Sequence, residues 1–320
     1  MRLWAHDRFL FPLPSHHRFP LGKYGLLRER VVELGLASAE EIIEPAALDW
    51  EDLALVHSPA LVERVRHGSF TKREEQALGL PWSPELAERA RRATRSTVEA
   101  AFDALEEGVG MNLGGGTHHA GHDVSRGYCL INDVAVAAAC ARREEWAERV
   151  LVVDCDVHQG DGTAELFAED PDTFTLSLHC ALNYPFTRAC SDLDVDLPSS
   201  TGDEAYLSFL SSALDQAFAT GPFDLAFYLA GAHPWEGDAL GRLSLTKEGL
   251  RARDDLVLER LRAEGAPACV VLAGGYAPNI EDTVEINAGT VAAVTERARA
   301  APRVKGKLDT RRSTGSVVAR

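Results

Sequence analysis

Residues 154–162, with the sequence DCDVHQGDG, carry the densest group of side chains that could bind a metal or take part in catalysis. They directly follow the apolar run 150–153, so we expect them at the end of a buried strand. If the backbone stays extended, alternation points Asp154, Asp156 and His158 to one side. Carboxylate oxygens and imidazole nitrogens suit Zn, Fe, Mn or Co. The segment therefore predicts a metal site, with a solvated aspartate-rich turn as the alternative.

A second group lies at residues 112–120, with the sequence NLGGGTHHA. The adjacent His118 and His119 follow three glycines, which indicates a constrained loop and not an amphipathic helix face. Two imidazoles offer either metal ligands or a general acid/base pair near neutral pH. A surface loop with incidental histidines is the alternative.

Two more apolar runs end in polar side chains. His233 follows one of them, where it would complete a metal site. Glu236 and Asp238 come next, either as partners behind the ligands or as a helix start. Tyr276 follows two glycines after the other run, where its hydroxyl would donate to a developing oxyanion. Simple packing is the alternative role for this tyrosine.

Bringing these side chains together requires a particular arrangement of strands and helices. Short apolar runs, typical of strands covered on both faces, occupy residues 111–113, 150–153, 174–178, 225–229 and 269–272. Helical patterns lie at 84–105, 132–148, 203–219 and 246–263, and Asn132 and Thr246 supply helix-start signals. This alternation predicts a three-layer α/β/α fold around a mainly parallel sheet, whose strands carry ligands at their carboxyl ends.

The 320-residue composition is that of a soluble globular protein, with 45% hydrophobic and 26% charged residues. No Ser/Gly-rich linker interrupts residues 1–300, so we expect one catalytic domain there. Residues 301–320 are predicted to form a flexible basic tail, or alternatively an interaction tail. Their charged residues are Arg303, Lys305, Lys307, Arg311, Arg312 and Arg320 against the single acid Asp309.

The formal net charge of −16 disfavours direct nucleic-acid binding, because neutralising phosphates requires surplus cations. It suits basic peptides or small cationic molecules as substrates. The six cysteines form no Cys-x-x-Cys pair, the N-terminus has no signal-peptide core, and no stretch approaches 18 apolar residues. We therefore expect a cytoplasmic location with reduced thiols and no membrane association.

Together these motifs resemble the zinc-dependent histone deacetylase family, which has an arginase-like fold. The elements GGGTHH, DxDxHxGxG, AGxxxxEGD and GGY occur in family order, and the resemblance runs from about residue 10 to 300. Gln159 and the sequence HRFPxxKY at 17–24 are similar to the class IV branch and its bacterial relatives. Arginases bind two manganese ions through Asp-x-His-x-Asp, whereas Asp-x-Asp-x-His here favours one catalytic metal.

The resemblance implies five catalytic residues. His118 and His119 match a histidine dyad, with His119 as the proton shuttle. Asp154 matches the acid behind His118, and Asp161 the acid behind His119. Tyr276 matches the hydroxyl that polarises the substrate carbonyl.

It also implies binding residues. Asp156 and His158 match metal ligands, while Gly127 and Tyr128 match the rim and wall of an acyl-lysine tunnel. The expected metal is zinc, with iron or cobalt as alternatives. A structural potassium ion is a further expectation, and its candidate site consists of Asp154, Ser177 and Leu178.

One position departs from the family pattern, because the third metal ligand is an aspartate in the family and His233 here. A His₂Asp set still binds metal. With one carboxylate the formal charge of an occupied site is +1 instead of zero, so bound water ionises more easily but gives a weaker nucleophile. We therefore hypothesise that metal binding is retained and that turnover is reduced or the metal preference shifts.

The sequence thus supports an amide hydrolase that removes acetyl or other acyl groups from lysine side chains of proteins. Acetylated polyamines and longer acyl chains are alternative substrates within this class. A catalytically weakened acyl-lysine-binding homologue is the second interpretation, motivated by His233. An arginase-like ureohydrolase is the third, and the ligand order disfavours it.

Overall fold

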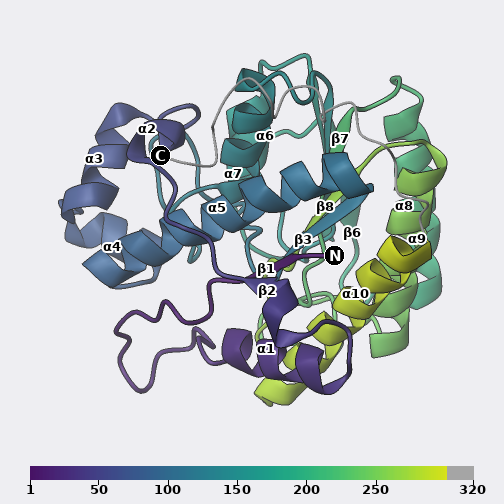
Figure 1. Ribbon diagram of the computed structural model, residues 1–320, viewed down its shortest axis with the longest axis horizontal. Helices are drawn as coiled ribbons and strands as arrows, with labels where there is room; N and C mark the ends of the chain where they lie inside the picture. The colour runs from purple at the N-terminus through teal and green to yellow at the C-terminus, as the bar shows by residue number, and fades with distance from the viewer. Residues whose placement is uncertain (301–320) are drawn as a thin grey trace.

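A computed structural model describes residues 1–300 of the chain, arranged as one eight-stranded sheet covered by helices on both faces (Figure 1). The strand order is β2-β1-β3-β8-β7-β4-β5-β6, and every pairing is parallel. The predicted three-layer α/β/α fold with a mainly parallel sheet is therefore confirmed. The predicted basic tail lies outside the described residues.

The strands are β1 (Leu3–Trp4), β2 (Ile42–Ile43), β3 (Val109–Asn112), β4 (Val150–Asp154), β5 (Thr173–Cys180), β6 (Leu193–Leu197), β7 (Leu225–Leu229) and β8 (Ala268–Val271). The helices are α1 (Lys23–Glu33), α2 (Trp50–Leu53), α3 (Pro59–His67), α4 (Lys72–Leu78), α5 (Pro84–Glu107), α6 (Asp133–Arg143), α7 (Asp161–Phe167), α8 (Asp203–Phe218), α9 (Lys247–Ala263) and α10 (Ile280–Ala300). A short 3₁₀ helix spans Ala39–Glu41.

The sheet core divides into two apolar clusters because side chains alternate along each buried strand. In β4, Val150 and Val152 pack on the face covered by α5 and α6. Leu151 and Val153 point the other way, into the cluster formed with α1, α8, α9 and α10. Figure 1 shows α8, α9 and α10 gathered on one side of the sheet, with α2, α3 and α4 beside α5 on the other.

The five predicted strands all form, and so do the four predicted helices. The predicted helix starts are confirmed, since Asn132 accepts a hydrogen bond from an amide of α6 and Thr246 does the same for α9. The prediction that the helix starting near residue 132 extends to residue 148 is wrong, because α6 ends at Arg143. There Glu145 has a φ of 56°, and Trp146 donates to the Ala141 carbonyl, which closes the last turn.

In the described part of the chain, no helix combines the length and apolar character that crossing a membrane requires.

Candidate active site

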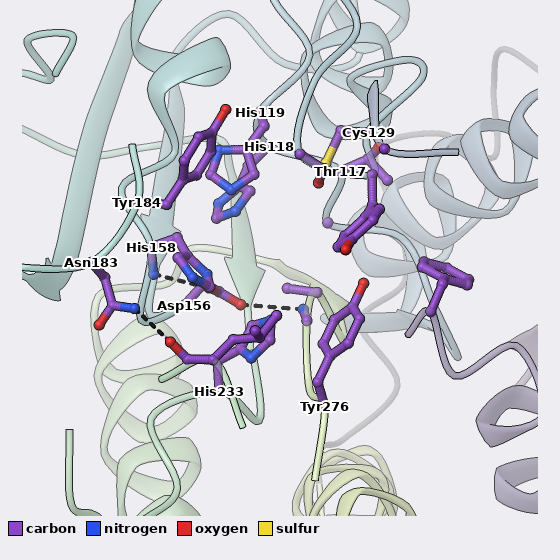
Figure 2. Close-up of a pocket in the computed structure, with 18 of the residues that line it drawn as sticks. Thr117, His118, His119, Cys129, Asp156, His158, Asn183, Tyr184, His233 and Tyr276 are labelled. Atoms are coloured by element: carbon purple, nitrogen blue, oxygen red, sulfur yellow. Dashed lines mark hydrogen bonds and ion pairs between the residues drawn. The ribbon is translucent and has the colours of Figure 1, made fainter. Parts of the chain in front are cut away.

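The predicted chemical groups meet at one edge of the sheet. Strands β3, β8, β7 and β4 are consecutive neighbours, and all run in the same direction. The loops that follow them therefore emerge side by side at their carboxyl ends. Figure 2 shows the side chains of these loops turned toward a common cavity.

Three of these side chains form a group of potential metal ligands, namely Asp156, His158 and His233. One ligand atom of each lies within 4.8 Å of the others, and all three residues are buried. Burial alone would raise the pKa of Asp156, but His233 and His158 hold it well below its usual range. The carboxylate therefore stays ionised, and this donor set of one carboxylate and two imidazoles fits a transition-metal dication.

Two glycines make room for these ligands. A Cβ atom at Gly231 would lie 2.3 Å from Asp156 Oδ2, and one at Gly274 would lie 2.1 Å from His233 Nε2. The Gly274 amide also donates to Asp156 Oδ2 at 3.2 Å. Any larger residue at either position would displace a ligand, which explains glycine at both strand ends.

Asp238 orients His233. Its Oδ1 lies 2.9 Å from His233 Nδ1 and also accepts from the Leu240 and Gly241 amides, each at 2.8 Å. Its Oδ2 accepts from the Tyr276 amide at 2.6 Å. Donation from Nδ1 to this carboxylate leaves the Nε2 lone pair free for a metal. From the sequence, Glu236 and Asp238 were candidate partners of the metal ligands or a helix start. Asp238 contacts His233, whereas Glu236 is exposed.

The predicted histidine dyad is also present. His118 Nδ1 and Asp154 Oδ2 are 2.6 Å apart, as are His119 Nδ1 and Asp161 Oδ1. The two imidazole centroids lie 4.1 Å apart, and all four residues are buried. Each histidine thus has its own acid, as the resemblance implied.

The two histidines have opposite proton affinities. Burial alone would lower the pKa of His118, but Asp154 outweighs it and raises the value to about 9. Burial lowers the pKa of His119 well below its usual range, and the neighbouring His118 and His158 lower it further. Near pH 7 the pair therefore consists of a charged His118 and a neutral His119, which can accept a proton.

Arg126 is a residue of the site that the sequence reasoning missed. Its Nε donates to the His119 carbonyl at 2.8 Å and lies 3.0 Å from Asp161 Oδ2. Its Nη2 lies 3.1 Å from Glu165 Oε2. The guanidinium therefore holds both members of the His119–Asp161 pair. It follows His119 by only seven residues, but nothing local in the sequence marks this contact.

Tyr276 lies against the ligand group, as Figure 2 shows. Its ring stacks on His233 at 5.0 Å with an interplanar angle of 5°, and on Tyr128 at 5.6 Å. Desolvation raises the pKa of Tyr276 well above its usual range, and Tyr24 and Tyr128 raise it further. The hydroxyl therefore stays protonated, as a hydrogen-bond donor must.

The cavity has a volume of about 460 Å³, and both predicted tunnel residues, Gly127 and Tyr128, line it. A Cβ atom at Gly127 would lie 2.7 Å from His119 Cδ2, so this wall approaches the dyad closely. Tyr184 also lines the cavity, and its ring meets that of His119 edge-on with the centroids 4.9 Å apart. The cavity is also lined by residues 76–79 at the end of α4, and neither these residues nor Tyr184 was named from the sequence.

The candidate potassium residues lie on neighbouring strands, with Asp154 opposite Ser177 in the β4–β5 register and Leu178 next to it. Ser177 Oγ lies 2.9 Å from His179 Nδ1, and Asp154 Oδ1 accepts from the Asp156 amide at 3.0 Å. These are contacts within the protein and do not test for a bound ion, so the potassium site stays a prediction.

The fold of this site is found in known proteins. It matches the crystal structure of an HDAC homolog complexed with SAHA, with a TM-score of 0.79, 23% identity, and coverage of 92% of this chain and 84% of that one. It also matches the HD domain of HDA15, with a TM-score of 0.74, 25% identity, and coverage of 92% and 91%.

The sequence matches the histone deacetylase domain model over residues 17–291, and the chain belongs to this family. It is 41% identical to an uncharacterized protein of Picosynechococcus over 87% of this chain and 93% of the relative. It is 28% identical to histone deacetylase 2 of Arabidopsis thaliana, over 88% of this chain and 76% of that protein. It is 33% identical to the human polyamine deacetylase HDAC10, over 78% of this chain and 39% of that protein. Membership of the family supports deacetylase activity in general terms.

Proposed function

We propose that this protein is a zinc-dependent hydrolase that removes acetyl or other acyl groups from lysine side chains of proteins. The observation that carries the proposal is the convergence of Asp156, His158 and His233 within 4.8 Å, beside two His–Asp pairs. A bound metal ion would supply a Lewis acid for the amide carbonyl and the attacking water.

The chain's own residues would do the remaining work. Neutral His119 would accept the proton of the attacking water, with Asp161 stabilising the imidazolium that forms. Charged His118 would deliver a proton to the leaving amine. The Tyr276 hydroxyl would donate a hydrogen bond to the oxyanion that develops on the carbonyl. The products would be a carboxylate and a free amine.

Tyr276→Phe is expected to lower kcat by about 10²–10³-fold, the usual cost of removing one oxyanion donor. The metal content should stay unchanged, because the Tyr276 ring and its stacking on His233 are kept. Steady-state turnover of an acetyl-lysine peptide and metal analysis together check this. Tyr206→Phe is the matched control, since it removes a buried hydroxyl outside the cavity. Equal losses in the two variants would argue against an oxyanion role.

The substrate class is proposed from charge and from relatives. The net charge of −16 attracts basic proteins and polyamines alike. The human relative is named a polyamine deacetylase, and this keeps acetylated polyamines as the alternative substrate. Measuring kcat/KM for an acetyl-lysine peptide, for a longer acyl-lysine peptide and for an acetylated polyamine separates these choices. Urea release from a guanidino substrate would instead favour a ureohydrolase.

His233→Asp tests the unusual ligand. We expect the zinc-loaded variant to turn over about tenfold faster than the protein with His233, a barrier change of about 1.4 kcal/mol, because a second carboxylate makes the occupied site neutral and gives a stronger nucleophile. Zinc, iron and cobalt contents should also differ between the two proteins. Metal analysis and steady-state kinetics make the comparison, and matching contents and rates would overturn the hypothesis.

A catalytically weakened acyl-lysine-binding protein remains the second candidate, and the replacement of a carboxylate ligand by His233 is the observation that favours it. Turnover of an acetyl-lysine peptide with and without a chelator distinguishes the two candidates. Chelator-sensitive turnover supports the hydrolase. Peptide binding without turnover in the metal-loaded protein supports the binding role.

A further inference from the structure

A fully buried polar cluster lies next to the metal-ligand loops, on the side covered by α9 and α10. We call it the Arg253 cluster, and it consists of Arg253, Asp254, Tyr228 and Thr290. Each of these residues is at most 1% exposed. Burying an arginine–aspartate pair is costly and often stabilises a fold no better than apolar residues would. The cluster therefore calls for a role beyond filling the core.

Arg253 contacts the backbone of both loops that carry metal ligands. Its Nη1 donates to the Gly231 carbonyl at 2.6 Å and makes a longer contact of 3.5 Å with the Cys155 carbonyl. Cys155 immediately precedes Asp156, and Gly231 comes two residues before His233. One guanidinium thus joins the two strand ends from which the ligands emerge.

The rest of the cluster holds Arg253 in place. Asp254 Oδ1 accepts from Arg253 Nη2 at 2.8 Å and from Arg253 Nε at 3.0 Å. The same carboxylate accepts from the Tyr228 hydroxyl and from Thr290 Oγ1, each at 2.6 Å. Because β7, α9 and α10 all contribute, the orientation of the guanidinium is determined by three elements.

The strand ends that Arg253 joins lie in contact with a ligand. A Cβ atom at Gly231 would lie 2.3 Å from Asp156 Oδ2, so these two loops leave no spare space between them. A displacement of the Gly231 carbonyl would therefore change the separation of Asp156 and His233.

We infer that Arg253 is a positioning residue of the metal site, which it serves by holding the Asp156 and His233 loops at the separation that binding needs. The inference deepens the proposed function, since it rests on a metal ion bound by these ligands. It does not require that the bound metal support turnover.

Arg253→Lys is the decisive variant. Lysine keeps a positive charge opposite Asp254, but one ammonium group cannot reproduce the planar fork that reaches the carboxylate and both carbonyls. The readouts are the Zn²⁺ dissociation constant, from competition with a chelator, and the visible spectrum of the Co²⁺-loaded protein. We expect zinc affinity to fall about 10–100-fold, as for other groups that support metal ligands, and the Co²⁺ bands to shift.

Asp103→Asn is the matched control for lost stability. Asp103 is also buried and hydrogen-bonded, to Trp4 and Arg2, but it contacts none of the metal ligands. The Asp103→Asn variant should lower the midpoint of urea unfolding while leaving the zinc affinity and the Co²⁺ spectrum unchanged. Thr290→Val, which removes one hydrogen bond to Asp254, should weaken zinc binding in the same direction by a smaller factor. It decides the question if Arg253→Lys does not fold.

Three results would overturn the inference. The first is a folded Arg253→Lys protein with unchanged zinc affinity and Co²⁺ spectrum. The second is an equal loss of zinc affinity in Asp103→Asn. The third is unchanged zinc affinity in Thr290→Val when Arg253→Lys fails to fold. Absence of metal binding by the natural protein would overturn both this inference and the proposed function. Metal binding without hydrolysis would count against the proposed function alone, because the variants would still test Arg253.

Discussion

Asp156→Asn is expected to remove the metal ion and to lower turnover by about 10³-fold or more, since a metal supplies several kcal/mol of transition-state stabilisation. The asparagine keeps the size of the side chain but loses the only carboxylate of the ligand group. Metal analysis of the purified variant and turnover of an acetyl-lysine peptide check both parts.

Glu236→Gln is the control for this variant, because it removes an exposed acid from the loop that carries His233. It should keep metal content and turnover near those of the natural protein. An Asp156→Asn protein that still bound one equivalent of metal would contradict the proposed ligand set.

His119→Gln is expected to lower kcat by about 10²–10⁴-fold, the usual contribution of a general base. The metal content should be kept, since His119 is outside the ligand group. Because burial and two neighbouring imidazoles lower the pKa of His119, the natural protein should hold its rate as the pH falls below 6.5. Its kcat should decline only when His119 takes up a proton, well below that value.

His122→Gln is the control, as His122 is an exposed histidine three residues further along the same loop. Comparison of kcat and its pH profile in the two variants separates base catalysis from a general effect on the loop. Loss of rate in His122→Gln as large as that in His119→Gln would count against a specific role for His119.

The parts of the fold that sequence predicted are those with strong local signals. Strands β3, β4, β5, β7 and β8 are apolar runs buried on both faces, so their composition identifies them. The chemical groups directly follow such runs, and the parallel arrangement then brings Asp156, His158 and His233 together.

The elements that were missed have weak or misleading signals. Strands β1 and β2 contain two residues each, too few for a pattern. The edge strand β6 does have one, since Leu193, Val195 and Leu197 alternate with acids. That alternation is typical of a strand with one exposed face, and reading it would have found β6.

The missed site residues depend on contacts between distant segments. Tyr184 reaches the cavity from a loop and residues 76–79 reach it from the end of α4, and no local pattern determines where these segments lie. Arg253 lies in a helix and is separated from the Cys155 carbonyl by 98 residues. Its charge suggests an exposed position, yet it is fully buried. Only the assembled fold reveals these partnerships.

The cavity and the ligand group have different structural origins. Asp156, His158 and His233 follow central strands, whereas Phe19, Tyr184 and residues 76–79 belong to loops or helix ends outside the sheet. Sequence changes in these outer segments can widen or narrow the entrance without disturbing strand pairing. The molecules that fit the cavity can therefore change in evolution while the ligand group keeps its place at the strand ends.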